Sequence, residues 1–144
     1  MVFTMALLGK IYKSTQIQEK TLDAAWLRNE VLSHNIANVD TPTYQRKDVD
    51  FEKYLRNALN YGVHDLIVNR RHNFRFNKRP GVDSVHARVT EDYNTMAMRI
   101  DGNNVDIDAE MAQMAVNTIR YNTVVQNVNG KFSKLKYAIS EGKR

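Results

Sequence analysis

The feature that most constrains this chain of 144 residues is a long apolar heptad pattern at its C-terminus. Apolar residues recur there with alternating steps of four and three, interrupted once by a threonine. The positions are Ile107, Met111, Met114, Thr118, Tyr121, Val125, Val128, Phe132, Leu135 and Ile139. A stripe with this spacing faces a partner helix along its whole length. The pattern predicts a helix of about 50 Å at 1.5 Å per residue, which favours an extended bundle or an intermolecular contact over a compact domain.

A second apolar stripe lies beside this C-terminal seam in the first half of the predicted helix. Its members are Ala112, Ala115, Val116 and Ile119. Small side chains there would allow a second helix to approach closely, so this half of the helix could contact two neighbours. Acidic residues open the segment and lysines occupy its last third, which is the arrangement that the helix dipole favours.

The N-terminal half carries a shorter version of the same pattern, at Leu22, Ala25, Asn29, Leu32 and Ile36. A polar residue at a seam position, here Asn29, is typical of residues that select the register and partner of a helix. Pro42 ends the predicted helix, because it disfavours a helical conformation at Thr41 and has no amide hydrogen of its own. Polar residues over 14–18 interrupt the pattern upstream, so we expect residues 1–18 to order only on binding.

The middle of the chain gives only short signals. Apolar residues at helical spacing predict a short helix over residues 48–60. Apolar and polar residues alternate around 85–89 and again around 96–100, which predicts a small two-stranded element. We therefore predict a mainly α chain, with long N- and C-terminal helices forming an extended coiled-coil-like bundle and a polar irregular middle that contains a short helix and a small β element. The expected divisions are 1–40, 41–104 with a basic loop, and 105–144.

The formal net charge of +5 is concentrated partly in residues 64–88, where arginines alternate with aromatic rings. Cations can neutralise phosphates and rings can stack on bases, so a nucleic-acid-binding module is one interpretation. The segment has none of the spacings of known nucleic-acid-binding motifs. A solvated loop, or a contact with an acidic protein surface, is the interpretation that we favour, with no nucleic-acid partner.

Enzyme chemistry finds little support in the sequence. The absence of cysteine excludes disulfides, thiolate metal sites and thiol nucleophiles. The four histidines form no metal-binding spacing, and residues 101–108 resemble a calcium loop without its required glycine and glutamate. A turn that caps the following helix explains residues 101–108 better. We expect no enzyme activity, no cofactor and no metal, and no segment approaches the roughly 20 apolar residues of a membrane span.

Residues 32–44 read LSHNIANVDTPTY and closely resemble the N-terminal signature of the flagellar rod, hook and filament-junction family, N-I-A-N-x-x-T-P-x-Y. The matching residues are Asn35, Ile36, Ala37, Asn38, Thr41, Pro42 and Tyr44. Thr43 stands where the family usually has glycine. Residues 101–106, 110–112 and 131–136 are similar to those of a proximal rod member of this family, and another rod or axial member is the alternative.

This resemblance implies a structural subunit of the bacterial flagellar basal-body rod that transmits motor torque, lines the export channel and performs no catalysis. It implies export by the flagellar type III system without a cleaved signal peptide, and a place in the rod across the periplasm without direct membrane insertion. The implied partners are the chain itself, other rod subunits, and the membrane-ring and export-gate proteins at the rod base.

We expect the two terminal helices to carry the assembly interface. Its predicted residues are Leu22, Ala25, Leu32, Asn35, Ile36, Asn38, Ile107, Met111, Met114, Tyr121, Val125, Val128, Phe132, Leu135 and Ile139. For Asn35 and Asn38 two roles remain open. Each could make a buried amide contact that fixes the exit of the chain from the first helix, or each could cap that helix locally.

Overall fold

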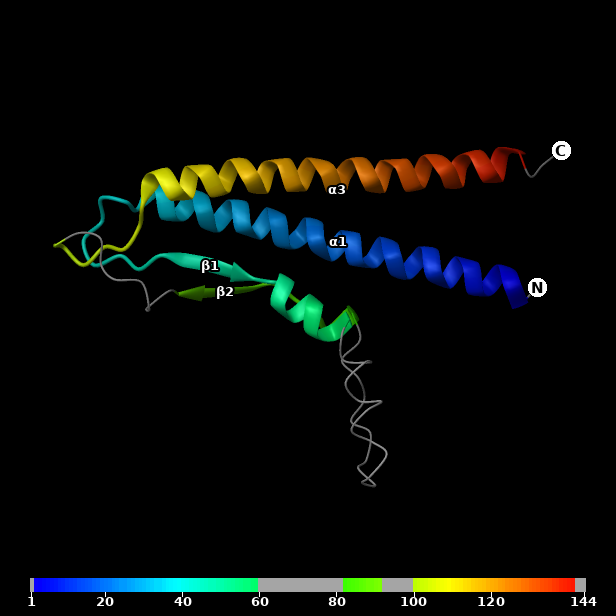
Figure 1. Ribbon diagram of the computed structural model, residues 1–144, viewed down its shortest axis with the longest axis horizontal. Helices are drawn as coiled ribbons and strands as arrows, with labels where there is room; N and C mark the ends of the chain where they lie inside the picture. The colour runs from blue at the N-terminus through cyan, green and yellow to red at the C-terminus, as the bar shows by residue number, and fades with distance from the viewer. Residues whose placement is uncertain (1, 60–81, 92–99, 142–144) are drawn as a thin grey trace, which may run out of the picture.

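A computed structural model shows two long antiparallel helices that lie side by side, with a small sheet against the first of them (Figure 1). Helix α1 spans Val2–Ala37 and helix α3 spans Ile107–Glu141. The structure describes residues 2–59, 82–91 and 100–141, with side chains from residue 14 onward. Both termini lie at one end of the helix pair, and the connecting loops lie at the other (Figure 1). The predicted mainly α fold with two long terminal helices is confirmed.

Helix α1 runs without a break through residues 14–18, so the predicted interruption there was wrong. The polar side chains that suggested it have partners outside the helix. Ser14 Oγ accepts a hydrogen bond of 2.7 Å from Lys131 Nζ, and Gln16 donates to Asp83. Intrinsic helix propensity is a weak signal that tertiary contacts readily override, which is why the polar run does not end the helix.

The start of α3 confirms the predicted capping turn. Asp106 Oδ1 accepts hydrogen bonds from the backbone N–H groups of Asp108 and Ala109, at 3.0 and 3.3 Å. These are amides that have no acceptor inside the helix. Just before this cap, Asn103 N donates to Asp101 Oδ1 at 3.1 Å. Asp106 therefore caps the start of α3, and Asp101 stabilises the turn that precedes it.

The small β element pairs strand β1 (Lys47–Asp50) with strand β2 (Arg88–Glu91) in antiparallel register, with Val49 opposite Val89. The sequence predicted a small β element correctly, and its predicted strand over 85–89 overlaps β2. The partner strand is β1, whose residues 48–50 the sequence had assigned to a helix, and that assignment was wrong. The short helix is observed over 52–59. Residues 60–81, with most of the basic segment, and 96–99 lie outside the described residues.

The apolar core is thin and lies mostly between α1 and the middle segment. Ala24 packs with Phe51 and Val85, and Tyr54 and Leu55 lie against them. A 3₁₀ helix, η1 (Val82–Ser84), precedes Val85. Helix α1 thus lies between the sheet and α3 (Figure 1).

In the described parts of the chain no helix has a stretch long and apolar enough to cross a membrane.

Candidate assembly interface

Asn35, in the last turn of α1, connects three separate segments and is fully buried. Its Nδ2 group donates to Lys47 O at 2.7 Å and to Glu110 Oε2 at 2.8 Å. Its Oδ1 atom accepts from the Tyr44 hydroxyl and from Lys47 N, each at 3.0 Å. An amide side chain has two donor hydrogens and two acceptor lone pairs, and all four are used. Asn35 therefore fixes the exit of the chain from α1 relative to both β1 and α3.

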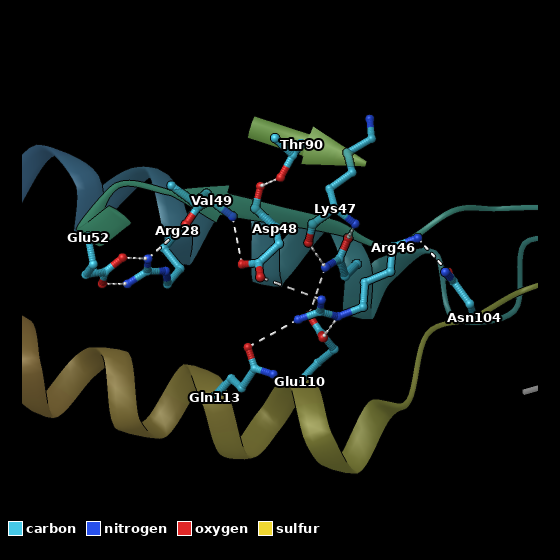
Figure 2. Close-up of polar contacts among 11 residues, drawn as sticks. Arg28, Arg46, Lys47, Asp48, Val49, Glu52, Thr90, Asn104, Glu110 and Gln113 are labelled. Carbon is cyan, nitrogen blue, oxygen red and sulfur yellow. Dashed lines mark hydrogen bonds and ion pairs between the residues drawn. The ribbon is translucent and has the colours of Figure 1, made fainter. Parts of the chain in front are cut away.

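Glu110, in the first turn of α3, forms an ion pair with Arg46 (Figure 2). Arg46 Nε lies 2.6 Å from Glu110 Oε1, and the two side chains are 14% and 1% exposed. Arg46 Nη2 also donates to Gln113 Oε1 at 3.3 Å, and the backbone N–H of Arg46 donates to Asn104 Oδ1 at 2.6 Å. A buried carboxylate is stable only when it is paired and hydrogen-bonded. Arg46 and Asn35 together supply those partners to Glu110.

Asn103 ties the loop after α1 to the segment before α3, and it is fully buried. Its Nδ2 group lies 2.9–3.0 Å from the carbonyl oxygens of Asn38, Val39 and Thr41. Its Oδ1 atom accepts from Val105 N at 2.8 Å. Asn103 thus adds a side-chain donor to carbonyl groups of the turn after α1, where Asn38 O and Thr41 O also accept from the backbone N–H groups of Thr41 and Tyr44. We call Asn35, Tyr44, Arg46, Asn103 and Glu110 the polar joint.

Asn38 has the second of the two roles that the sequence left open. Its Nδ2 group donates to His34 O at 2.7 Å, and its Oδ1 atom accepts from Thr41 Oγ1 at 3.3 Å. Both partners lie within four residues, so Asn38 caps the end of α1 locally. Asn35, in contrast, makes the buried contacts between segments.

The turn that follows Pro42 places Thr43 in the left-handed region, with φ of 59°. Thr43 is the one non-glycine residue with positive φ in the part of the chain that the structure describes. Its backbone N–H donates to Asp101 O at 3.1 Å, which holds the loop against the segment before α3. A left-handed conformation costs a residue with a Cβ atom roughly 1–2 kcal/mol. The turn thus keeps a geometry suited to glycine although threonine occupies it.

Side chains of α1 also cover the backbone of β1 on the edge opposite β2. Asn35 binds both backbone groups of Lys47, and Arg28 Nη2 donates to Val49 O at 2.9 Å. Arg28 also forms two hydrogen bonds of 2.7 Å with Glu52. These hydrogen bonds to Glu52 raise the pKa of Arg28, and they are the main cause of the lowered pKa of Glu52. The edge of β1 that faces α1 is therefore capped by side chains, which blocks its pairing with a further strand.

Burial separates the predicted interface residues of α3 into two groups. Half-buried residues that face α1 are Met114, Tyr121, Val125, Val128 and Leu135. Residues that remain 42–67% exposed are Ile107, Met111, Phe132 and Ile139. On α1, Ala25 and Leu32 are buried, and Leu22 and Ile36 are half-buried. The C-terminal seam is thus only partly covered within the chain.

Two polar residues of α3 are more deeply buried than any of the predicted seam residues of that helix. Glu110 is 1% exposed and Asn117 is 2% exposed. Asn117 Nδ2 donates to Ala25 O at 2.8 Å and to Asn29 Oδ1 at 2.9 Å. Sequence reasoning missed both residues because it followed apolar positions alone. The polar seam residue Asn29 was the one signal that could have indicated a polar partner.

The chain aligns along most of its length with flagellar basal body rod proteins. It is 34% identical to FlgB of Bacillus subtilis (strain 168) over 125 residues, which are 87% of this chain and 92% of that protein. The chain belongs to the FlgB family. It is also 34% identical to FlgB of Borreliella burgdorferi over 85% of this chain and 91% of that protein. Identity to FlgB of Yersinia enterocolitica is 28% over 94% of this chain and 100% of that protein. No protein-family model matches the chain.

Membership of the FlgB family confirms the resemblance seen in residues 32–44 and 101–136, and it makes the chain a structural subunit of the flagellar basal body rod. Several residues of the family motif in this chain make contacts within the polar joint. Tyr44 binds Asn35, and the carbonyl group of Thr41 binds Asn103. Burial of the Tyr44 hydroxyl, with the charges of Glu110 and Glu91, raises the pKa of Tyr44. Pro42 and Ala37 are exposed and Ile36 is half-buried.

Proposed function

We propose that this chain builds the rod by packing its terminal helices against those of other subunits. In this proposal residues 1–40 and 105–144 are the assembly regions, and residues 41–104 form a middle segment held at the joint. The partners are copies of the chain, other rod subunits, and the membrane-ring and export-gate proteins at the rod base. The assembled rod transmits torque and surrounds the export channel, through which the chain itself is exported.

One observation carries this proposal, namely the apolar surface that α3 leaves uncovered. Val116 and Ile119 are 48% and 66% exposed. At 100° per residue, the stripe formed by Ala112, Ala115, Val116 and Ile119 points away from the face that Glu110 and Asn117 turn towards α1. Further exposed apolar residues of α3 are Ile107, Met111, Phe132, Tyr137 and Ile139. Large apolar side chains exposed on several faces of one helix are typical of a helix that is covered by protein–protein contacts.

The same surface supplies the association free energy. Burial of apolar area contributes roughly 25 cal/mol per Å², and a long helix can bury area against several neighbours at once. A chain that covered this surface by itself would have little left to contribute to a rod. The proposal therefore couples the final ordering of the terminal helices to assembly, while the polar joint is complete within one chain.

The test places a charge on the uncovered stripe. Ile119→Glu should leave the helix content and melting temperature of the free chain unchanged, because Ile119 makes no buried contact there. It should prevent incorporation into basal bodies and abolish motility, because a carboxylate would be buried in the subunit contact.

Asn127→Glu is the matched control, since Asn127 is exposed on the same helix, about two turns beyond Ile119 and rotated about 80° away from it. It should incorporate as the wild-type chain does. Normal incorporation and motility with Ile119→Glu would contradict the proposed packing surface.

A further inference from the structure

The apolar contacts between α1 and α3 do not by themselves define how the two helices align. Met114, Tyr121, Val128 and Leu135 all face α1 and are spaced by seven residues. A slip of α3 by one heptad would place each of them where the next now lies. An evenly repeated apolar seam can therefore pair in several registers, and with the same seam of another copy.

Three polar contacts cross the same interface at unevenly spaced points. The pairs, which we call the polar rungs, are Asn35 with Glu110, Asn29 with Asn117, and Ser14 with Lys131. Their donor-to-acceptor distances are 2.8, 2.9 and 2.7 Å. The two residue numbers of each pair add up to 145 or 146, as expected for one antiparallel register. On α3 the rungs occupy a single heptad position, at 110, 117 and 131.

The third of the four occurrences of this heptad position is apolar, which makes the set of rungs asymmetric. Position 124 is Val, and the same register would place it opposite Thr21. The Thr21 hydroxyl donates to Ile17 O in its own helix, at 2.8 Å, so it needs no partner on α3. Polar pairs thus occupy the first, second and fourth of four successive heptads.

A slip by one heptad would break this match in either direction. In one direction Asn29 would lie opposite Val124, and Glu110 would lie beyond the end of α1. In the other direction Ser14 would lie opposite Val124, and Asn35 would lie beyond the start of α3. Each slip buries polar groups without partners, which lowers the population of that register by about tenfold or more per rung.

The middle rung is not optimised for stability. Asn117 is 2% exposed, and its Oδ1 atom has no hydrogen-bond partner among the described residues. A buried amide with an unpaired acceptor is less favourable than a well-packed leucine at the same place. A polar residue at one seam position is a known means of fixing register at some cost in stability.

We propose that the polar rungs restrict α1 and α3 to one register with each other, and so prevent their seams from pairing wrongly with the seams of other copies. The inference rests on the proposed function, in which many copies of these helices meet. It adds to that function a role for Asn29 and Asn117 in selecting the register of the two helices. With this register fixed, the outward stripe of α3 stays available to neighbouring subunits.

The absence of cysteine in the chain allows a direct test by disulfide formation in the full-length protein. Ile17→Cys with Val128→Cys reports the observed register, because these two numbers also add up to 145. Ile17→Cys with Tyr121→Cys reports a slip by one heptad. Each cysteine pair is introduced into the otherwise unchanged chain, into N29L/N117L, and into the control N122L/N127L, in which two exposed amides of α3 are replaced.

In the unchanged chain and the control, the 17–128 disulfide should form at least tenfold faster than the 17–121 disulfide. In N29L/N117L, the slipped disulfide and disulfides between chains should together rise at least fivefold, while the melting temperature does not fall. Disulfides between chains are included in this sum because the polar joint is unchanged in N29L/N117L. The joint still opposes a slip of the two helices within one chain, so lost register can also lead to pairing with another copy. This combination of equal or higher stability with lost register is the signature of a register-selecting residue.

Equal product ratios in all three backgrounds would overturn the proposal, because apolar packing and the joint would then suffice. Loss of helix in N29L/N117L and also in the single variant N117L would overturn it too, since the rung would then be needed for folding. The assay uses the free chain, so a failure of rod assembly does not affect it. The Ile119→Glu experiment tests the proposed function separately.

Discussion

The two ends of the α1–α3 pair are built from different kinds of contact. The joint end, which comprises residues 28–37 of α1 and 107–117 of α3, is held by buried amides and by an ion pair whose carboxylate is 1% exposed. The terminal end comprises residues 2–17 of α1 and 125–141 of α3. There Phe132 and Ile139 remain 56% and 67% exposed. Both ends leave apolar side chains of α3 exposed, including Val116 at the joint end, but the joint end is in addition fixed by buried polar contacts.

The difference teaches how one chain can combine a fixed local structure with a transferable contact. Hydrogen bonds between buried groups are directional, so the joint has one arrangement. Apolar burial is non-directional and roughly proportional to area, so the terminal surface can be covered by any helix of suitable shape. Substitutions should thus destabilise the free chain strongly at the joint end and weakly at the terminal end.

The largest expected effect comes from removing the buried carboxylate. Glu110→Ala should lower the free energy of unfolding by about 3 kcal/mol, because it removes the close, buried partner of the Arg46 charge and leaves only Asp48, at 3.8 Å. Ile139→Ala at the terminal end should change it by less than about 0.5 kcal/mol. Urea unfolding followed by circular dichroism gives both values. Similar losses for the two variants would remove the distinction between the ends.

The next effect separates two asparagines of one motif. Asn35→Ala should cost about 2–3 kcal/mol, because both backbone groups of Lys47 and one oxygen of Glu110 lose a buried partner. Asn38→Ala should cost about 1 kcal/mol, the usual value for a local cap. The same unfolding measurement compares them, and a larger loss for Asn38 would reverse the assigned roles.

A smaller effect of opposite sign is expected at the turn of the joint. Thr43→Gly should raise the free energy of unfolding by about 0.5–1 kcal/mol, because glycine adopts a positive φ without the strain that a Cβ atom causes. Thr41→Gly should lower it by a similar amount, since Thr41 does not have a positive φ. Thermal melting of both variants tests the pair, and stabilisation by both would show that the backbone angle at residue 43 is not the cause.

The smallest effect concerns the exposed ion pair beside the joint. The bond to Arg28 lowers the pKa of Glu52, so the pair stabilises the chain above the unfolded pKa of this carboxyl group. That contribution disappears as the pH falls below about 4. Because the Glu52 side chain is 53% exposed, it amounts to about 0.5 kcal/mol. Glu52→Gln should lose this amount at pH 7 and nothing at pH 3, and high salt should reduce the difference.

Sequence reasoning predicted the two long helices, their caps and the break at Pro42, because each depends on neighbouring residues in the chain. It failed for β1, where Lys47–Asp50 holds a single apolar residue. This strand is held by side chains of Asn35 and Arg28, which lie more than ten residues away. No local pattern could indicate such a contact.

The polar joint was accessible to sequence reasoning only in part. Asn35 was named with two possible roles, and Glu110 was explained by the helix dipole and by the family resemblance. The sequence holds 15 asparagines, and four of the five buried polar residues that the structure describes are asparagine: Asn35, Asn103, Asn104 and Asn117. Which asparagines are buried depends on partners up to 92 residues away, so composition could not select them.

The sequence by itself determined that this chain forms two long helices with apolar stripes and that it carries the signature of a flagellar axial family. Periodicity and capping are local, and they act through adjacent turns of one helix. Only the tertiary structure decided which face of α3 meets α1, because Glu110 and Asn117 turn that face towards partners on another helix. Hydrogen bonds between distant segments therefore set the alignment of the helices, and the apolar residues left outside this contact form the surface available for assembly.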